Sequence, residues 1–155
     1  MSTERIKHVV CATRGRPVNL DAISTAIDLC LEHDAPLTFL MLLEAEFIGQ
    51  VTPTMSSLRT LYQQMKEMSE FSLLVLCEEA KQLGVTQVDY IIRTGNLRKQ
   101  LREFVTQTSA DVMVIVRPTS GPGWSAFTPE EFADFIRELE EVGNLRIISI
   151  EPNAE

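Results

Sequence analysis

The chain has 155 residues, of which 45% are apolar and 23% charged, a composition that is ordinary for a globular protein. Its formal net charge of −8 argues against nucleic acid or an anionic membrane as the main partner, because both are negatively charged. No apolar run approaches the roughly 20 residues of a membrane-spanning helix, and the N-terminus lacks the basic-then-apolar order of a secretion signal. We therefore expect one cytoplasmic domain over residues 1–155.

The metal-binding and redox-active residue types are few and scattered. Cys11, Cys30 and Cys77 are widely spaced, and each lies within an apolar stretch, which indicates buried reduced thiols. No Cys-x-x-Cys pair occurs, and His8 and His33 are isolated in the sequence. We therefore expect no metal site.

The first half of the chain predicts two buried strands and two helices. Residues 8–13 and 37–43 are short continuous apolar runs, which are typical of strands buried on both faces. Between them we expect a helix from the candidate N-cap Asn19 to about Asp34, because its apolar residues share one helical face. A second helical period covers residues 54–84, which is long enough to overhang the sheet or to kink.

The second half continues the alternation. Residues 85–92, 111–116 and 145–150 are predicted strands, with the middle one the most apolar. A helix capped by Asn96 separates the first two, and another helix, ending near Gly143, separates the last two. Five strands alternating with four helices predict an α/β fold of three layers, α/β/α, with a parallel sheet whose ligands bind at the carboxyl ends of the strands.

Two stretches carry a family resemblance. Residues 8–42 read HVVCATRGRPVNLDAISTAIDLCLEHDAPLTFLML, and residues 90–116 read YIIRTGNLRKQLREFVTQTSADVMVIV. With Gly95 and the pair Ala110-Asp111 at matching spacing, the chain resembles the universal stress protein family over essentially its whole length. The resemblance implies a five-stranded parallel sheet in the order 3-2-1-4-5, the universal stress protein-like or adenine nucleotide alpha hydrolase-like fold.

The resemblance stops at the nucleotide motif. Family members that bind ATP carry Gly-x2-Gly-x9-Gly and then Ser or Thr after the fourth strand. Aligned by spacing, these positions fall on Arg117, Ser120, Glu130 and Glu131, so all three glycines are absent. The family's aspartate after the first strand is replaced by Arg14. The resemblance therefore implies that the glycine motif does not bind ATP here, and we expect no cofactor, with ATP or AMP as the disfavoured alternative.

The residues themselves predict the same outcome. Thr128, Pro129 and Glu131 form a strong helix start, with an N-cap, a proline at the first helical position and a capping box. Glu130 and Glu131 would neutralise the positive end of this helix, where an anion would otherwise bind. We expect this helix end to be closed to phosphate.

Four arginines follow the first, third and fourth strands, and the parallel sheet would bring them to one edge. They could line a crevice for a small anion, a nucleotide or an acidic partner segment, because the guanidinium group offers planar donors. The simpler interpretation is solvated charges that pair with Glu44, Glu46, Glu130 or Glu131. The candidate ligand-binding residues are Thr13, Arg14, Gly15, Arg16, Leu43, Arg93, Gly95, Arg117 and Ser120.

The last strand is expected at the edge of the sheet, where its apolar side chains leave it poorly protected. Pairing with a second copy across a two-fold axis would remove that liability, and the family resemblance also implies dimerisation through this strand. We expect a homodimer whose interface comprises Leu145, Arg146, Ile147, Ile148, Ser149 and Ile150.

Two other features have a structural and a functional interpretation. Trp124 is more typical of a residue that covers the core than of a lid over a base. Met55, Met65 and Met68 could line an adaptable partner groove, but core filling is the simpler interpretation.

No catalytic constellation can be assembled, because neither histidine falls at the carboxyl end of a predicted strand. We expect a non-enzymatic, cytoplasmic, regulatory or protective protein like the universal stress proteins, which acts through dimerisation and through protein or small-anion contacts. The alternative is a nucleotide-binding switch that uses the arginines at the carboxyl ends of strands one, three and four.

Overall fold

The computed structural model describes residues 6–13, 20–43, 55–118 and 127–151. The element order agrees with the predicted alternation of strands and helices. The elements are β1 (Val9–Thr13), α1 (Leu20–His33), β2 (Leu37–Leu43), α3 (Met55–Gln82), β3 (Val88–Thr94), α4 (Leu97–Gln107), β4 (Val112–Val116), α5 (Pro129–Gly143) and β5 (Arg146–Ile150).

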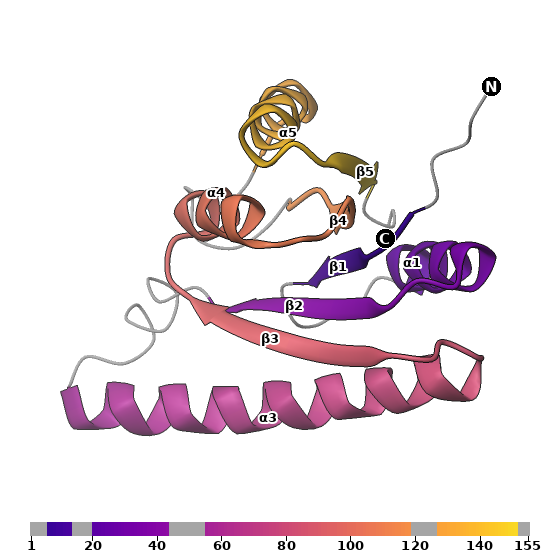
Figure 1. Ribbon diagram of the computed structural model, residues 1–155. Helices are drawn as coiled ribbons and strands as arrows, with labels where there is room; N and C mark the ends of the chain where they lie inside the picture. The colour runs from indigo at the N-terminus through magenta and orange to yellow at the C-terminus, as the bar shows by residue number, and fades with distance from the viewer. Residues whose placement is uncertain (1–5, 14–19, 44–54, 119–126, 152–155) are drawn as a thin grey trace.

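The sheet has five strands in the order β3-β2-β1-β4-β5, and every described pair is parallel, so the predicted fold and strand order are confirmed. Figure 1 shows α4 and α5 on one face of the sheet and α3 on the other, which gives the expected three layers. All seven residues of β2 are buried, as a strand covered on both faces requires.

Alternating residues of the strands feed two separate hydrophobic clusters. Val10 and Leu40 pack with residues of α4 and α5, whereas Cys11 and Phe39 pack with residues of α1 and α3. This alternation follows from the two-residue period of a strand. The sheet is therefore fixed from both sides, and its carboxyl edge is a rigid support for the residues that follow each strand.

The long helix α3 spans 28 residues, about 42 Å at 1.5 Å per residue. It runs without interruption, and its N-terminal part extends beyond the sheet, so the expected overhang is observed (Figure 1). The helix ends before Gly84, whose φ of +114° is the backbone conformation that favours glycine.

The third strand begins later than predicted. Val85 was expected to open it, but its amide donates to the carbonyl of Ala80 in the last turn of α3, and its side chain is buried there. The strand runs instead from Val88 to Thr94. An apolar residue that closes a helix end was mistaken for the start of a strand.

The amino edge of the sheet is closed by side-chain hydrogen bonds. The carboxylate of Asp111 accepts from the amides of Lys7 and His8, each at 2.9 Å. The buried hydroxyl of Thr38 donates to Asp89 at 2.7 Å and lies 2.8 Å from Nε2 of His8. These bonds hold neighbouring strands in register at the end opposite to the expected site.

All three cysteines are free and buried, as the sequence predicts. Burial raises the pKa of the Cys11 thiol to about 12, with a further contribution from nearby Cys30. Burial likewise raises the pKa of Cys30 to about 12. These thiols are therefore protonated near neutral pH and poor nucleophiles.

Replacing Gly143 with Ala should destabilise the protein, because the last residue of α5 approaches α4 too closely for a side chain. An added Cβ would lie 2.6 Å from Cβ of Val105 and 2.8 Å from its carbonyl oxygen. Overpacking of this kind costs about 1–3 kcal/mol in the free energy of unfolding. Urea denaturation measures the loss, and the exposed control Glu141→Ala should stay within about 0.5 kcal/mol of the wild type. A wild-type stability for Gly143→Ala would contradict the close approach.

Candidate functional site

The expected site lies where the winding of the sheet reverses, between β1 and β4. Thr13 ends β1, and its hydroxyl donates to Sδ of Met41 on β2 at 3.5 Å. Leu43 ends β2, and its carbonyl accepts from the amide of Gly95 at 3.0 Å. The structure thus brings Thr13, Leu43 and Gly95 to the same edge, as expected from three parallel strands.

The turn after β3 is built by Gly95 and Asn96. Gly95 has φ +143°, and an added Cβ would lie 3.0 Å from the side-chain amide nitrogen of Gln100. Asn96 then caps α4 as predicted, because its side chain accepts from the amide of Lys99 at 3.0 Å. The first turn of α4 therefore already has an acceptor for one of its free amides.

A hydrogen bond between the long helix and β3 lies at this edge as well. The hydroxyl groups of Tyr62 and Thr94 are 2.8 Å apart. From the sequence, Tyr62 was expected only to lie within the long helical period of residues 54–84. A tyrosine in such a period signals a polar partner for its hydroxyl, but the residue spacing gives no indication of which one.

Arg93 lies on β3, but its guanidinium group turns toward α4. It lies over the ring of Phe104, 5.3 Å from the ring centre, and donates to the side-chain oxygen of Gln107. Gln107 is the last residue of α4, so this arginine bonds to the C-terminal end of that helix. Its partners are an aromatic ring and a neutral amide, not the carboxylates that were expected.

Arg117 follows β4 and has three acceptors within the chain. Its guanidinium group pairs with Glu151 at 2.9 Å and donates to the carbonyl of Phe127 at 3.0 Å. The hydrogen bond to Glu151 and the charges of Glu151 and Glu130 raise the pKa of Arg117, while the bond to Arg117 and its charge lower the pKa of Glu151. An ion pair was expected for this arginine, but Glu151 was not among the partners considered.

The four remaining predicted site residues, Arg14, Gly15, Arg16 and Ser120, lie outside the described residues, as do Glu44, Glu46 and Trp124. The proposed arginine crevice therefore stays a prediction. Of its four arginines, the two that the structure describes bond to groups of the chain itself.

The predicted capping box at the start of α5 is present. The side chain of Thr128 accepts from the amide of Glu131 at 3.2 Å, and the carboxylate of Glu131 accepts from the amide of Thr128 at 2.9 Å. Pro129 occupies the first helical position. The bonds from Thr128 and the charge of Arg98 lower the pKa of Glu131, so a carboxylate covers the positive helix end at neutral pH.

A hydrophobic staple, which the sequence analysis missed, extends this helix start. Phe127 directly precedes the N-cap and packs on Phe132 in the first turn, with ring centres 5.3 Å apart. The guanidinium carbon of Arg98 lies 4.1 Å from the centre of the Phe127 ring. The amide of Phe127 also donates to the carbonyl of Pro118 at 3.0 Å, which joins the end of β4 to the start of α5. The apolar residue just before the N-cap was the available signal.

Within the described parts of the chain, no group of three His, Cys, Asp or Glu residues is placed to hold a metal ion. No helix in the same parts is both long enough and apolar enough to cross a membrane. Neither histidine lies at the carboxyl edge: His8 precedes β1 and His33 ends α1.

The topology defines an α/β protein of the doubly wound type, a class in which ligands bind at the switch point. The sequence profile of the Universal stress protein family matches residues 5–122, so the chain belongs to that family. The match ends before the capping box of α5. No curated protein shows significant sequence similarity to the chain.

Known structures share the fold at low sequence identity. The universal stress protein UspA from Lactobacillus plantarum has a TM-score of 0.73 and 14% identity over 96% of this chain and 99% of its own. A universal stress family protein from Burkholderia pseudomallei has a TM-score of 0.66 and 12% identity over 96% and 98%. A family protein from Arabidopsis thaliana, solved with AMP bound, has a TM-score of 0.57 and 16% identity over 96% and 93%.

The charge of Glu131 should make the stability of α5 depend on pH. Its pKa is lowered in the folded protein, so the carboxylate stabilises the fold above the ordinary value of 4.5 and loses that effect as the pH falls through the lowered pKa. We expect Glu131→Gln to unfold at a lower temperature than the wild type at pH 7, and the two curves to converge in acid, where both side chains are neutral.

Thermal unfolding followed by circular dichroism between neutral and acidic pH tests this expectation. The matched control Glu141→Gln removes an exposed carboxylate from the last part of the same helix and should keep the wild-type unfolding temperature at pH 7. A gap between wild type and Glu131→Gln that stays constant down to the acid end of the series would contradict the assignment.

Proposed function

We propose that the protein is a regulatory or protective member of the universal stress protein family that does not bind ATP through the family's glycine motif. The observation that carries the proposal is the reciprocal Thr128–Glu131 capping box. It places a carboxylate at the helix end where the family's motif has a glycine and a hydroxyl residue.

The surroundings of this helix end support the proposal. Arg117 stands at the first glycine position of the motif, and its guanidinium group is bonded to Glu151 and to the Phe127 carbonyl. A phosphate at this place would have to displace those acceptors and would meet the charge of Glu131. Like charges at short range oppose binding, and the helix end gains little from a second anion once the first is in place.

The alternative is a nucleotide-binding switch with a modified pocket. Two similar structures give it support: one is a universal stress protein in complex with cAMP, and the Arabidopsis thaliana protein has AMP bound. Such a pocket would use the arginines after strands one, three and four. Arg93 and Arg117 would then have to leave their present partners, which counts against the alternative.

We further propose a non-enzymatic, cytoplasmic role. The described residues hold two histidines, neither of them at the carboxyl edge, and the three cysteines are buried and free. Buried thiols without disulfides are typical of a reducing compartment. The protein would act by binding other molecules and would not transform them.

A thermal-shift panel of ATP, ADP, AMP and cAMP tests the first proposal. Saturation at 100 times the dissociation constant would add about 2.7 kcal/mol, which is a shift of about 5–10 °C for a domain of this size. We expect no shift with ATP at millimolar concentration. A shift with ATP would contradict the proposal.

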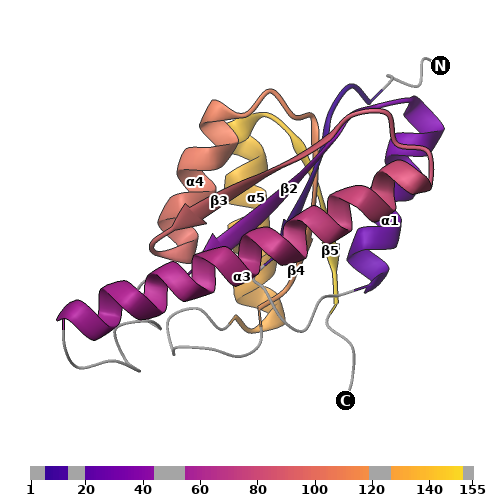
Figure 2. The same cartoon turned by 90° about the horizontal axis from the view of Figure 1, so that it is seen from below.

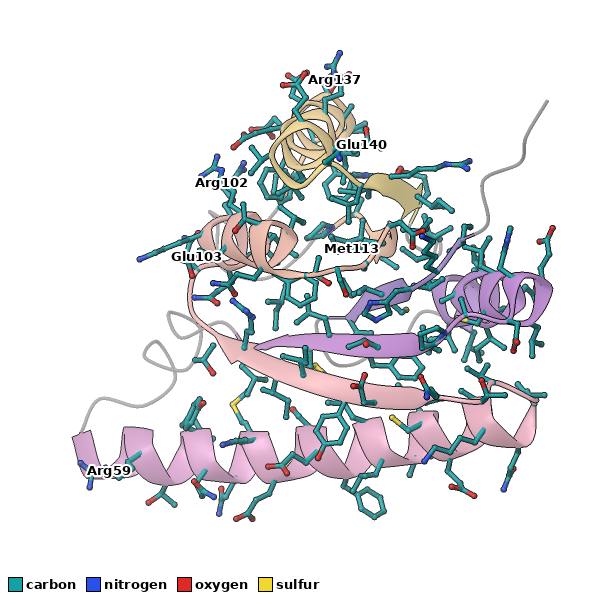
Figure 3. The ribbon with its side chains drawn as sticks, viewed as in Figure 1. Arg59, Arg102, Glu103, Met113, Arg137 and Glu140 are labelled. Carbon is teal, nitrogen blue, oxygen red and sulfur yellow. The ribbon has the colours of Figure 1, made fainter. Side chains whose placement is uncertain are left out.

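The same panel also tests the alternative. A shift with AMP or cAMP that disappears in Arg93→Gln would support the arginine pocket. The matched control is Arg137→Gln on α5, an arginine that points away from the sheet in Figure 3. If Arg137→Gln also lost the thermal shift, the loss would reflect the change in the protein's net charge and not a contact in the pocket.

We also propose that the protein forms a homodimer through β5. The strand lies at the edge of the sheet, next to β4 only. The backbone N–H and C=O groups of alternate residues in a strand point to opposite sides. The backbone groups of Arg146 and Ile150 bond on the side of β4, so those of Ile147 and Ser149 point to the free edge. The carboxylate of Glu140 already accepts from the amide of Ile147 at 2.9 Å, so the amide of Ser149 is the donor that a second strand can use most readily.

The substitution Ser149→Glu should weaken this dimer, because the two copies would place like charges close to the two-fold axis. The matched control Thr86→Glu adds the same charge in the turn before β3, at the opposite edge of the sheet. Sedimentation velocity should give a dimer for the wild type and the control and a larger monomer fraction for Ser149→Glu. A monomeric wild type at all concentrations would contradict the proposal.

A further inference from the structure

The outer face of α3 exposes four apolar side chains within two helical turns. These residues are Met68, Phe71, Leu74 and Val75, with exposed fractions of 66%, 70%, 55% and 43%. We call them the α3 apolar patch. Met68 was assigned to core filling in the sequence analysis, and that assignment is wrong, since it lies on the solvent side.

The patch faces away from the rest of the molecule. At 100° per residue its members fall within an arc of about 120° centred on Phe71. The buried residues Leu73, Cys77 and Ala80 lie on the opposite side of the helix and pack on the sheet. No described helix or strand lies beyond α3 on its outer side in either view (Figures 1 and 2).

The spacing matches a helix that inserts into a partner. Met68, Phe71 and Val75 are separated by three and four residues, which is the anchor pattern of helix-in-groove recognition. The exposed apolar residues of the other described helices form no such group: Leu20 and Leu31 are 11 positions apart on α1, and Val142 lies on α5. Scattered exposed apolar residues are common, whereas a contiguous patch marks an interaction surface.

The charges around the patch identify the chemistry of the occupant. Glu67, Glu78 and Glu79 are exposed on the same outer half of α3, and Lys81 is the exposed basic residue of this stretch. The patch is therefore an apolar centre with a predominantly negative rim. Electrostatic complementarity requires a positive rim on the partner.

This rim argues against two other occupants. A second copy of the chain, with its α3 packed on this one, would bring three further carboxylates and only one further lysine to the interface. An anionic lipid surface would be repelled by the same carboxylates and by the net charge of −8. Neither objection applies to a basic protein surface.

We propose that the α3 apolar patch docks a partner protein through an apolar surface rimmed by Lys or Arg. The inference rests on the proposed role through protein contacts and gives those contacts a location. The patch is separate from the carboxyl edge and from β5. A negative result for docking at the patch would therefore leave the nucleotide and dimer proposals unaffected. Negative results for nucleotide binding or dimerisation would likewise leave the docking experiment interpretable.

A synthetic basic amphipathic helix serves as the probe. It carries Leu at the core heptad positions and Lys at the flanking ones, and a second peptide with Glu in place of Lys is the control. Fluorescence anisotropy with the full chain should show binding of the Lys peptide, at least about tenfold weaker binding of the Glu peptide, and loss of affinity as salt is raised.

Two variants locate the binding. The double variant Phe71→Ser/Leu74→Ser should bind the Lys peptide at least about tenfold more weakly than the wild type, because it lacks two apolar anchors and keeps every charge. The control Leu20→Ser removes an apolar side chain that is 71% exposed on α1 and should bind as the wild type does. Circular dichroism establishes that each variant keeps the fold.

Several results would overturn the proposal. One is equal binding of the Lys peptide by the Phe71/Leu74 variant and the wild type, and another is no binding by the wild type at millimolar concentration. Self-association that Phe71→Ser abolishes would make a second copy the occupant. If the wild type sediments with anionic vesicles and Phe71→Ser does not, the occupant of the patch would be a lipid surface.

Discussion

A parallel sheet places the N-terminus of every following helix at its carboxyl edge, so unpaired backbone amides accumulate there. What satisfies these amides decides what the edge can bind. In this chain Asn96 caps α4, and Thr128 with Glu131 caps α5. Both caps come from the chain itself, and the second brings a negative charge to the place where a phosphate would otherwise gain most from the helix end.

The capped start of α5 is embedded in a wider set of contacts. Phe127 packs under Arg98 and on Phe132, while Arg117 holds the Phe127 carbonyl and Glu151. Opening the helix end to a phosphate would disturb an aromatic cluster and an ion pair together. In this member of the universal stress protein family, the start of α5 is thus held by contacts within the chain, and we place the proposed contacts with other molecules elsewhere, at β5 and on α3.

The sequence was sufficient for most contacts between residues close in the chain, although the Phe127–Phe132 staple and the helix end at Val85 were missed. The capping box, the Asn96 cap and the helix end at Gly84 each depend on a few neighbouring residues, and all were predicted. The partners of Arg93 and Arg117 were not, because Gln107 and Glu151 lie 14 and 34 positions away and surface charges choose among many partners. Met68 was misplaced for a related reason: a helix with apolar residues on two faces does not reveal from its period alone which face meets the sheet.

The carboxylate of Glu131 lies at the electropositive end of α5. Nuclear magnetic resonance of the backbone amides of Glu130 and Glu131, recorded during a titration with ATP, tests whether this end is closed to phosphate. Both resonances should stay in place, because the Thr128–Glu131 bonds persist. Saturable shifts of these two amides, confined to the start of α5, would contradict this closure.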